Sequence, residues 1–268
     1  MKILSLRNID EKEYILGYVL YYEKSKTFYI ELNDNIDPVK LPIVLDLHYM
    51  KGQLSINSYY SYLWLKDRVV PENRQNIGSI LKEAKLKEYD LFKLLMLNNG
   101  RCTNDEFELV EVKKLPNNIL KRFEYKVSDV IPIKDNKVLC FFANGVCKKI
   151  DIGKLKKDDR LFSRLLANPK EFNNVTILPG GYGIDFQNNL NIEDYVLYEK
   201  GEIVDIEYEN FLSFVDHNVI DTHSACEILE CSRQNIDDLV KRDKLKPIKQ
   251  GEKNKLFLLK DINIRNKY

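Results

Sequence analysis

The chain has 268 residues, which leaves room for two domains or three small ones at roughly 100–200 residues each. Its 42 basic and 41 acidic residues nearly cancel, so bulk charge points to no partner, and no apolar run approaches the roughly 20 residues that span a bilayer. The start, MKILSLRNIDEKEY, lacks the apolar core of a signal peptide, and five cysteines make no disulfide framework, so we expect a cytoplasmic protein. Frequent Lys, Ile and Asn with scarce Ala are typical of an AT-rich bacterial genome.

The first region, residues 1–123, begins with strands and continues with helices. YILGYVLYY and KTFYIELND alternate aromatic and β-branched residues between turns, which predicts two strands. PIVLDLHYMKGQLSI predicts a further strand pair that turns at Lys51 and Gly52. Apolar residues at helical spacing predict three helices, in SYYSYLWLKDRVVP, NRQNIGSILKEAKL and YDLFKLLMLNNG, the last ended by Asn99 and Gly100. We therefore predict an α+β N-terminal domain of unknown role.

The second region, residues 124–205, is expected to form a small antiparallel sheet domain with one helix. KVSDVIPI and KVLCFFA predict strands, and Asn144-Gly145 predicts a type I′ hairpin that leads into VCKKIDI. LKKDDRLFSRLLAN is amphipathic and supplies the helix, before strands at NNVTILP and YGIDF. The glycines of PGGYG are assigned to a turn, because a phosphate loop would need a helix directly after it.

The third region, residues 206–268, is predicted to be a packed connector followed by a winged helix-turn-helix. Residues 201–220 are too apolar for a flexible linker. THSACEILECSRQNIDDLVKRDKLKPIKQGEKNKLFLLKDINIRN then predicts a helix, a tight turn, a helix and a two-stranded wing. Asp221 and Ser232 are positioned to cap the two helices. Ile236, Leu239 and Val240 would pack inward, which leaves the polar residues of the second helix facing outward.

Those polar residues suit recognition of double-stranded DNA. We expect the bases to be read by Arg233, Gln234 and Asn235, since Arg pairs with guanine and Gln or Asn with adenine. Eight basic residues against two acidic ones lie between 241 and 260, so positive charge is concentrated here. The residues expected to bind phosphate are Ser232, Lys241, Arg242, Lys249, Lys253 and Lys255. Asp237 and Asp238 lie on the same helix and would repel phosphate.

Residues 221–262 resemble the winged helix-turn-helix of excisionase-like and MerR-like DNA-binding domains. Ser232, the Lys244-Leu245-Lys246 step and the closing Lys260-Asp261-Ile262 carry the match. That pattern has a glycine in the turn where this chain has Glu230, so the turn must accept a side chain. The resemblance implies DNA binding, and a helical interaction module that does not bind DNA stays open as the alternative.

Two further resemblances concern the rest of the chain. Residues 126–198, through VSDVIPIKDNKVLCFFANG, LFSRLLANPKEFNNVTI and GYGIDF, resemble the small bacterial domain of unknown function catalogued as number 2442. That family often has Trp where Phe186 stands, and it implies a compact α+β fold without an assigned activity. The segment from Trp64 to Leu109 has a faint similarity to a segment ahead of the kinase in some HipA-like proteins of Firmicutes, but no kinase motif follows.

Other candidate sites have simpler explanations. None of His48, His217 and His223 has a second ligand at metal-binding spacing. Cys140 and Cys147 are expected on adjacent strands, near enough to meet. We interpret them as core residues in preference to a redox or metal-binding pair. A set of charged residues could either surround Trp64 as a site or form a structural ion-pair network, and the network is favoured. The set is Arg68, Arg74, Arg101, Asp67, Glu72 and Asp105. We therefore expect no catalytic residue, no cofactor and no bound metal.

The leading hypothesis is a sequence-specific DNA-binding regulator with α+β modules that sense a ligand or dimerise. We expect a homodimer, because one short reading helix buries little surface by itself. The alternative is an adaptor that binds protein, for example in a phage-defence or toxin–antitoxin locus. An enzyme hidden in residues 1–123 is the third and weaker option.

Overall fold

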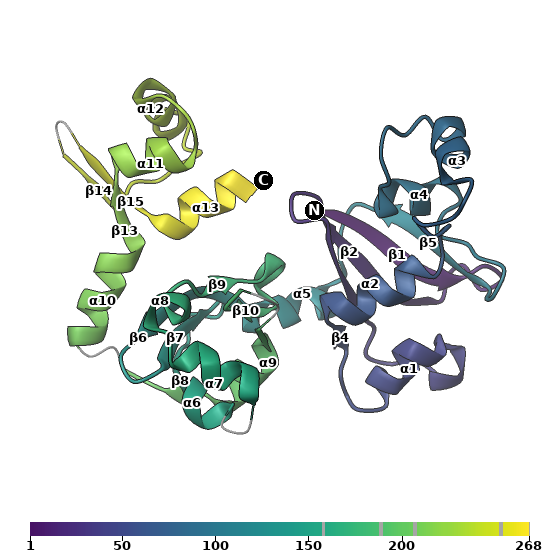
Figure 1. Ribbon diagram of the computed structural model, residues 1–268, viewed down its shortest axis with the longest axis horizontal. Coiled ribbons are helices and arrows are strands. Elements are labelled where there is room, and N and C mark those ends of the chain that lie inside the picture. Colours follow the sequence, from purple (N-terminus) through teal and green to yellow (C-terminus); the bar gives the residue numbers. More distant parts are fainter. Residues whose placement is uncertain (157–158, 188–189, 206–207, 252–253, 268) are drawn as a thin grey trace. The chain divides into compact units, whose positions relative to one another are not determined.

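The chain divides into two units, Met1–Phe123 and Glu124–Tyr268, and each has its own core (Figure 1). The computed structural model describes residues 1–156, 159–187, 190–205, 208–251 and 254–267. Helices combine with small antiparallel sheets in both units, so the predicted α+β class is confirmed at this level. Within the described ranges, no helix has the length and apolarity to cross a membrane.

A five-stranded antiparallel sheet in the order β4-β3-β2-β1-β5 forms the centre of the first unit. Its strands are β1 (Lys2–Asn8), β2 (Ile15–Tyr22), β3 (Thr27–Leu32), β4 (Ser55–Ile56) and β5 (Phe107–Val112). The strands predicted at YILGYVLYY and KTFYIELND are confirmed as β2 and β3, which are almost wholly buried. β1 and β5 were not predicted. β1 pairs with β2 on one side and with β5 on the other, so it connects β5 to the rest of the sheet.

Helices connect these strands. They are the 3-10 helices η1 (Pro38–Lys40) and η2 (Phe123–Tyr125, at the junction of the units), and α1 (Ile43–Tyr49), α2 (Ser58–Lys66), α3 (Ile77–Glu83), α4 (Leu91–Leu97) and α5 (Asn117–Arg122). The three predicted helices are confirmed as α2, α3 and α4. Asn99 and Gly100 follow α4 with φ angles of 56° and 64°, so they end that helix as expected.

The strand pair predicted for PIVLDLHYMKGQLSI is wrong. The segment forms helix α1 and then only the two-residue strand β4. A short apolar run fits either period, and here helical spacing buries Leu45 and packs Tyr49 against the core while Ile43 and Leu47 face outward. Gly52, with a φ of 73°, turns the chain after the helix, not between two strands.

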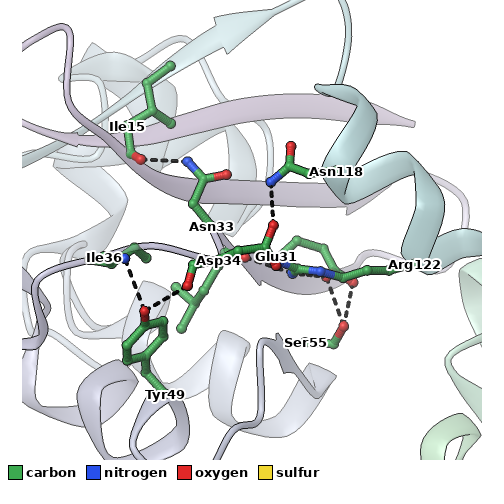
Figure 2. Close-up of polar contacts among 10 residues, drawn as sticks. Ile15, Glu31, Asn33, Asp34, Ile36, Tyr49, Ser55, Asn118 and Arg122 are labelled. Carbon is green, nitrogen blue, oxygen red and sulfur yellow. Dashed lines mark hydrogen bonds and ion pairs between the residues drawn. The ribbon is translucent and has the colours of Figure 1, made fainter.

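Arg122, the last residue of α5, fastens that helix to β3 (Figure 2). Its guanidinium donates to Glu31 Oε2 at 3.1 Å and to Asp34 Oδ1 at 2.6 Å. Glu31 is fully buried and also accepts from the Ser55 hydroxyl at 2.8 Å. The hydrogen bond from Asn118, followed by those from Arg122, lowers the pKa of the Asp34 carboxyl. This ion-pair network satisfies a buried carboxylate and holds the end of the first unit in place.

The second unit begins with a sheet in the order β12-β8-β7-β6 and a smaller one in the order β11-β10-β9. The strands are β6 (Val127–Ile133), β7 (Lys137–Phe142), β8 (Cys147–Asp151), β9 (Thr176–Ile177), β10 (Gly183–Asp185), β11 (Asn191–Glu193) and β12 (Glu202–Ile203). The helices are α6 (Ile152–Leu155), α7 (Arg160–Leu166), α8 (Pro169–Phe172), η3 (Pro179–Gly181) and α9 (Asp194–Lys200). The predicted strands are confirmed, but the expectation of a single helix is wrong, because Pro169 starts α8 directly after α7 and DYVLY lies in α9.

The turn between β7 and β8 differs from the type I′ turn predicted for it. Gly145 has a φ of 84°, but Asn144 is outside the left-handed region that a type I′ turn requires. The amide of Gly145 donates to the Phe142 carbonyl at 2.9 Å, and the amide of Phe142 donates to the Val146 carbonyl at 2.9 Å. Three residues therefore form the loop, and only glycine occupies the left-handed position.

Cys140 and Cys147 lie on opposite faces of this sheet. In the register, Cys140 is opposite Lys148 and Cys147 is opposite Phe141, so the two cysteines are offset by one residue. Side chains alternate between faces along a strand, and the thiols accordingly join two different apolar clusters. The expectation that the thiols could meet is wrong, and both are core residues.

The remainder of the second unit is a smaller group of elements with its own apolar cluster. It comprises α10 (Tyr208–Asn218), β13 (Val219–Asp221), α11 (Thr222–Ile228), α12 (Arg233–Lys241), β14 (Lys249–Gln250), β15 (Lys255–Leu258) and α13 (Leu259–Lys267), with a sheet in the order β13-β15-β14. As expected, residues before 221 pack: Phe214 of α10 lies 5.4 Å from Phe141 of β7, between ring centroids. Helix α13 was not predicted.

Candidate nucleic-acid interface

Both predicted caps are present in the two-helix segment α11–α12. The Asp221 carboxylate accepts from the Ser224 amide at 2.9 Å, and the Ser232 hydroxyl accepts from the Asn235 amide at 3.3 Å. The hydrogen bond from the Ser224 backbone also lowers the pKa of the Asp221 carboxyl. Each cap satisfies an amide that the helix itself leaves without a partner, so the sequence specifies where both helices begin.

The turn between the helices carries a side chain where glycine is usual. Glu230 has a φ of 49°, which is the left-handed conformation that a glycine usually adopts at this position of the turn. The Glu230 amide donates to the Glu227 carbonyl at 3.3 Å, and the Cys231 amide donates to the Cys226 carbonyl at 3.0 Å. These two bonds define a Schellman turn, in which the residues at the positions of Cys226 and Cys231 commonly contact each other. Both cysteines belong to the local apolar cluster, as packing residues should.

A small apolar core holds α12 against α11 and the hairpin β14–β15. Its buried members are Ala225, Ile236, Leu245, Phe257 and Ile262. Leu239 and Val240 pack against them, as the sequence predicts for the inner face of α12. The orientation of the polar side chains of α12 is therefore fixed by packing.

The three predicted base-reading residues do not share one face of α12. Successive residues of a helix are rotated by about 100°, so Arg233, Gln234 and Asn235 point in three directions. Arg233 turns toward the hairpin and donates to Asn254 Oδ1 at 2.6 Å. Gln234 is exposed and, by its spacing, shares the outer face with Asp238 and Lys241.

Asn235 lies on the other flank of α12, where a hollow of about 350 Å³ opens. Asp238 of α12 and Arg242 just after it line this hollow, and Arg265 and Asn266 line it from α13. The Arg265 guanidinium donates to the Lys244 carbonyl at 3.2 Å, which ties α13 to the end of α12. Sequence reasoning missed Arg265 and Asn266 because α13 was not predicted. The available signal was Leu259 and Ile262, which are spaced like the inner face of a helix.

Some of the predicted phosphate-binding residues already form ion pairs within the protein, and others do so only weakly. Lys255 forms an ion pair of 2.5 Å with Asp237, and its side chain is 20% exposed. The hydrogen bond from Lys255 lowers the pKa of the Asp237 carboxyl. The expected repulsion of phosphate by Asp237 is therefore reduced, while Lys255 is engaged within the protein. Lys241 lies 4.0 Å from Asp238, a weak contact on the exposed face.

The remaining predicted phosphate contacts lie at the surface. Arg242 follows α12 and Lys249 lies on β14, and both are exposed. Ser232 is exposed too, although its hydroxyl already caps α12. Lys253 lies outside the described residues. Arg242 and Lys249 are thus the best placed of the set to meet a phosphate.

The charged set around Trp64 is brought together only in part. Arg68 is buried, stacks 4.5 Å from the Trp64 ring centroid and forms a two-pronged ion pair with Asp105 at 2.7 Å. Arg101 pairs instead with Glu108. Among the residues with described positions, no group of His, Cys, Asp and Glu could hold a metal ion. Arg68 and Asp105 therefore form an ion pair with a buried arginine, where the network interpretation expected six residues on a solvated face.

Comparison of the chain with protein-family models, with curated proteins and with solved structures finds no match. The resemblances to an excisionase-like or MerR-like domain and to the domain catalogued as number 2442 therefore stay predictions.

Proposed function

We propose that β13 to α13 form a winged helix-turn-helix that binds double-stranded DNA, and that the protein is a sequence-specific regulator. In this proposal α12 enters the major groove and β14–β15 is the wing. The observation that carries the proposal is the placement of a Ser-capped helix with an exposed polar outer face beside a basic hairpin, on one small rigid core.

Charge supports the same assignment. The described residues between 241 and 260 include seven basic side chains and one acidic one: Lys241, Arg242, Lys244, Lys246, Lys249, Lys255, Lys260 and Asp243. Such a concentration in a chain of net charge +1 suits contact with phosphates. Gln234 is the exposed residue best oriented to read a base, and Arg233 would join it after leaving Asn254.

The test is the salt dependence of binding to a pool of mixed duplex DNA. We expect the logarithm of the binding constant to fall linearly with the logarithm of salt concentration, by about 0.9 per phosphate contact. Lys249→Ala should reduce this slope by about 1 and weaken binding to all sequences alike. Gln234→Ala should leave the slope unchanged and cost about 1–3 kcal/mol at selected sequences only.

Lys170→Ala, at an exposed position on α8 of the same unit, is the matched control and should change neither quantity. Absence of binding at low salt would reject DNA as the partner. That result would favour the alternative, an adaptor whose α12 face binds protein.

A further inference from the structure

The first unit exposes an apolar surface that its own fold does not use. Val39 is 90% exposed, Ile43 81% and Met50 70%, although all three are large and apolar. Leu47 at 59% and Tyr59 at 63% belong to the same set. Together with Tyr60 these residues are termed the α1–α2 face.

A ring contact through His48 joins the α1 part of this face to its α2 part. Ile43, Leu47 and Met50 follow at spacings of four and three, so they share one side of α1 and its end. The His48 ring of α1 lies 4.6 Å from the Tyr60 ring of α2, and Tyr60 lies 5.2 Å from Tyr59, between centroids.

The fold holds α1 firmly with this side outward. Leu45 is fully buried on the opposite side of the helix, and Leu41 is buried just before it. The Tyr49 hydroxyl donates to the Asp34 carbonyl at 2.9 Å and accepts from the Ile36 amide at 3.0 Å (Figure 2). The exposure is therefore a property of a well-anchored helix and not of a loose end.

The same stretch is almost free of charge. Residues 41–65 contain two charged side chains, Asp46 and Lys51, in a chain that is 31% charged. One carboxylate oxygen of Asp46 is buried. Depletion of charge with enrichment in Tyr and Met is typical of the core of a protein–protein interface. At its border, exposed Asp37 and Lys40 carry opposite charges, so the surface has no net charge that would favour a nucleic acid or a strongly charged protein.

The area fits a dimer. If each of the six side chains exposes on the order of 100 Å², the α1–α2 face offers roughly 600 Å², the upper end of what monomers leave uncovered. A standard interface buries about 800 Å² on each partner, which the six residues and their rim can supply. An uncharged surface of this size is complementary to a second copy of itself, as a twofold interface requires.

We propose that the α1–α2 face is the surface through which two copies of this chain associate. The choice of a second copy as occupant rests in part on the proposed function, because a single reading helix supplies only one half-site contact. In a twofold dimer the α1 helices of both copies contact each other, and each copy contributes one C-terminal DNA-binding segment.

The experiment is sedimentation velocity of the full chain over a range of concentrations, without DNA. The wild type should be a dimer, and Leu47→Asp or Met50→Glu should each weaken the dimer by about 100-fold or more, because each buries an unpaired charge. Leu97→Asp is the matched control. Leu97 is 60% exposed on α4, which Figure 1 draws at the other end of the first unit from α1, and its variant should stay dimeric.

Thermal unfolding of each variant checks that the fold is intact. We expect it to be intact, because Leu47 and Met50 are both exposed. A wild type that is monomeric at every concentration would overturn the proposal, as would a dimer that survives both substitutions or growth into open-ended assemblies. A dimer that breaks as expected in a protein that binds no DNA would keep this interface and reject the proposed function. If the α1–α2 face binds a different protein and not a second copy, the purified wild type should be monomeric, which is one of the outcomes that overturn the proposal.

Discussion

Asp129 is a buried carboxyl group of the second unit whose ionisation is disfavoured. It lies on β6 beside a register shift and is 8% exposed. Burial raises its pKa from the usual 3.8 to about 6, although its carboxylate accepts from the Val130 amide at 2.8 Å and Lys260 of α13 opposes the effect. The neighbouring Asp261 raises the pKa slightly further. The native state therefore holds this proton more tightly than the unfolded chain does.

This gives a pH prediction. Because the native pKa is raised, the contribution of Asp129 to stability is fully present below about pH 4 and is lost as the pH rises to about 6. Asp129→Asn should remove that loss and increase the free energy of unfolding at pH 7 by up to about 3 kcal/mol. Urea unfolding across this pH range measures it, with Asp135→Asn, at an exposed position, as the control. Equal pH profiles for wild type and Asp129→Asn would contradict the prediction.

The backbone conformation of Glu230 predicts how its substitution changes stability. A residue with a side chain pays about 1 kcal/mol for the left-handed conformation that Glu230 adopts at its φ of 49°. Glu230→Gly should relieve this cost and raise the free energy of unfolding by about 0.5–1 kcal/mol. Glu227→Gly, three residues earlier inside α11, should lower it by about 1 kcal/mol. Denaturant melts of both variants distinguish this account, which fails if the two substitutions destabilise alike.

Arg68 shows how one side chain joins elements that are far apart in the sequence. From the end of α2 it donates to the carbonyls of Gly100, at 2.5 Å, and Phe107, at 2.9 Å, as well as to Asp105. Although burial alone would raise the pKa of Asp105, the hydrogen bonds and charge of Arg68 lower it overall. The pair therefore links α2 to the strand entry of β5.

Removal of this arginine should be costly. Arg68→Ala leaves the Asp105 carboxylate and two carbonyls without their donor, so we expect the first unit to lose about 3–5 kcal/mol of stability. Arg74→Ala, at an exposed position six residues later, should change stability by less than about 0.5 kcal/mol. Chemical denaturation followed through Trp64 fluorescence reports on the same unit. A small effect of Arg68→Ala would mean that water replaces the lost donors.

Elements with a strong local signal could be predicted from the sequence. β2 and β3 have long aromatic and β-branched runs, and α12 has a serine cap and an inner face at helical spacing. α1 could not be distinguished from a strand, because its short apolar run fits both periods until its partners in the core are known. β5 depends on pairing with β1 across about 100 residues, which no local pattern encodes, whereas β1 also pairs with the nearby β2 and was missed although that pairing is local.

The candidate site was predictable to a similar degree. The caps, the inner face of α12 and the side chain at Glu230 follow from residue type and spacing alone. The directions of Arg233 and Asn235 follow from helical rotation, but their surroundings do not. The contact of Arg233 with Asn254 and the pairing of Lys255 with Asp237 depend on how the hairpin lies along α12, which is set by the shared core.

The two units have different proposed roles, dimerisation for the first and DNA binding for the end of the second. The first unit offers an uncharged helical surface, and the second ends in a basic segment with a capped helix. Within the second unit, the sheet that contains β6, β7 and β8 has an apolar cluster on each face, one of which includes Phe214 of α10. The sheet is therefore packed on both sides and contacts the elements that lead to the C-terminal segment.

Helix α10 ends at Asn218 and strand β13 begins at Val219, without a residue between them. β13 in turn pairs along β15, the strand that carries Lys255. The two elements are therefore directly consecutive in the chain. If a small molecule or protein tilts α10 on the sheet that Phe214 contacts, we expect β13 and its partner strand β15 to move with it, and the contact proposed between α12 and DNA to weaken or strengthen accordingly.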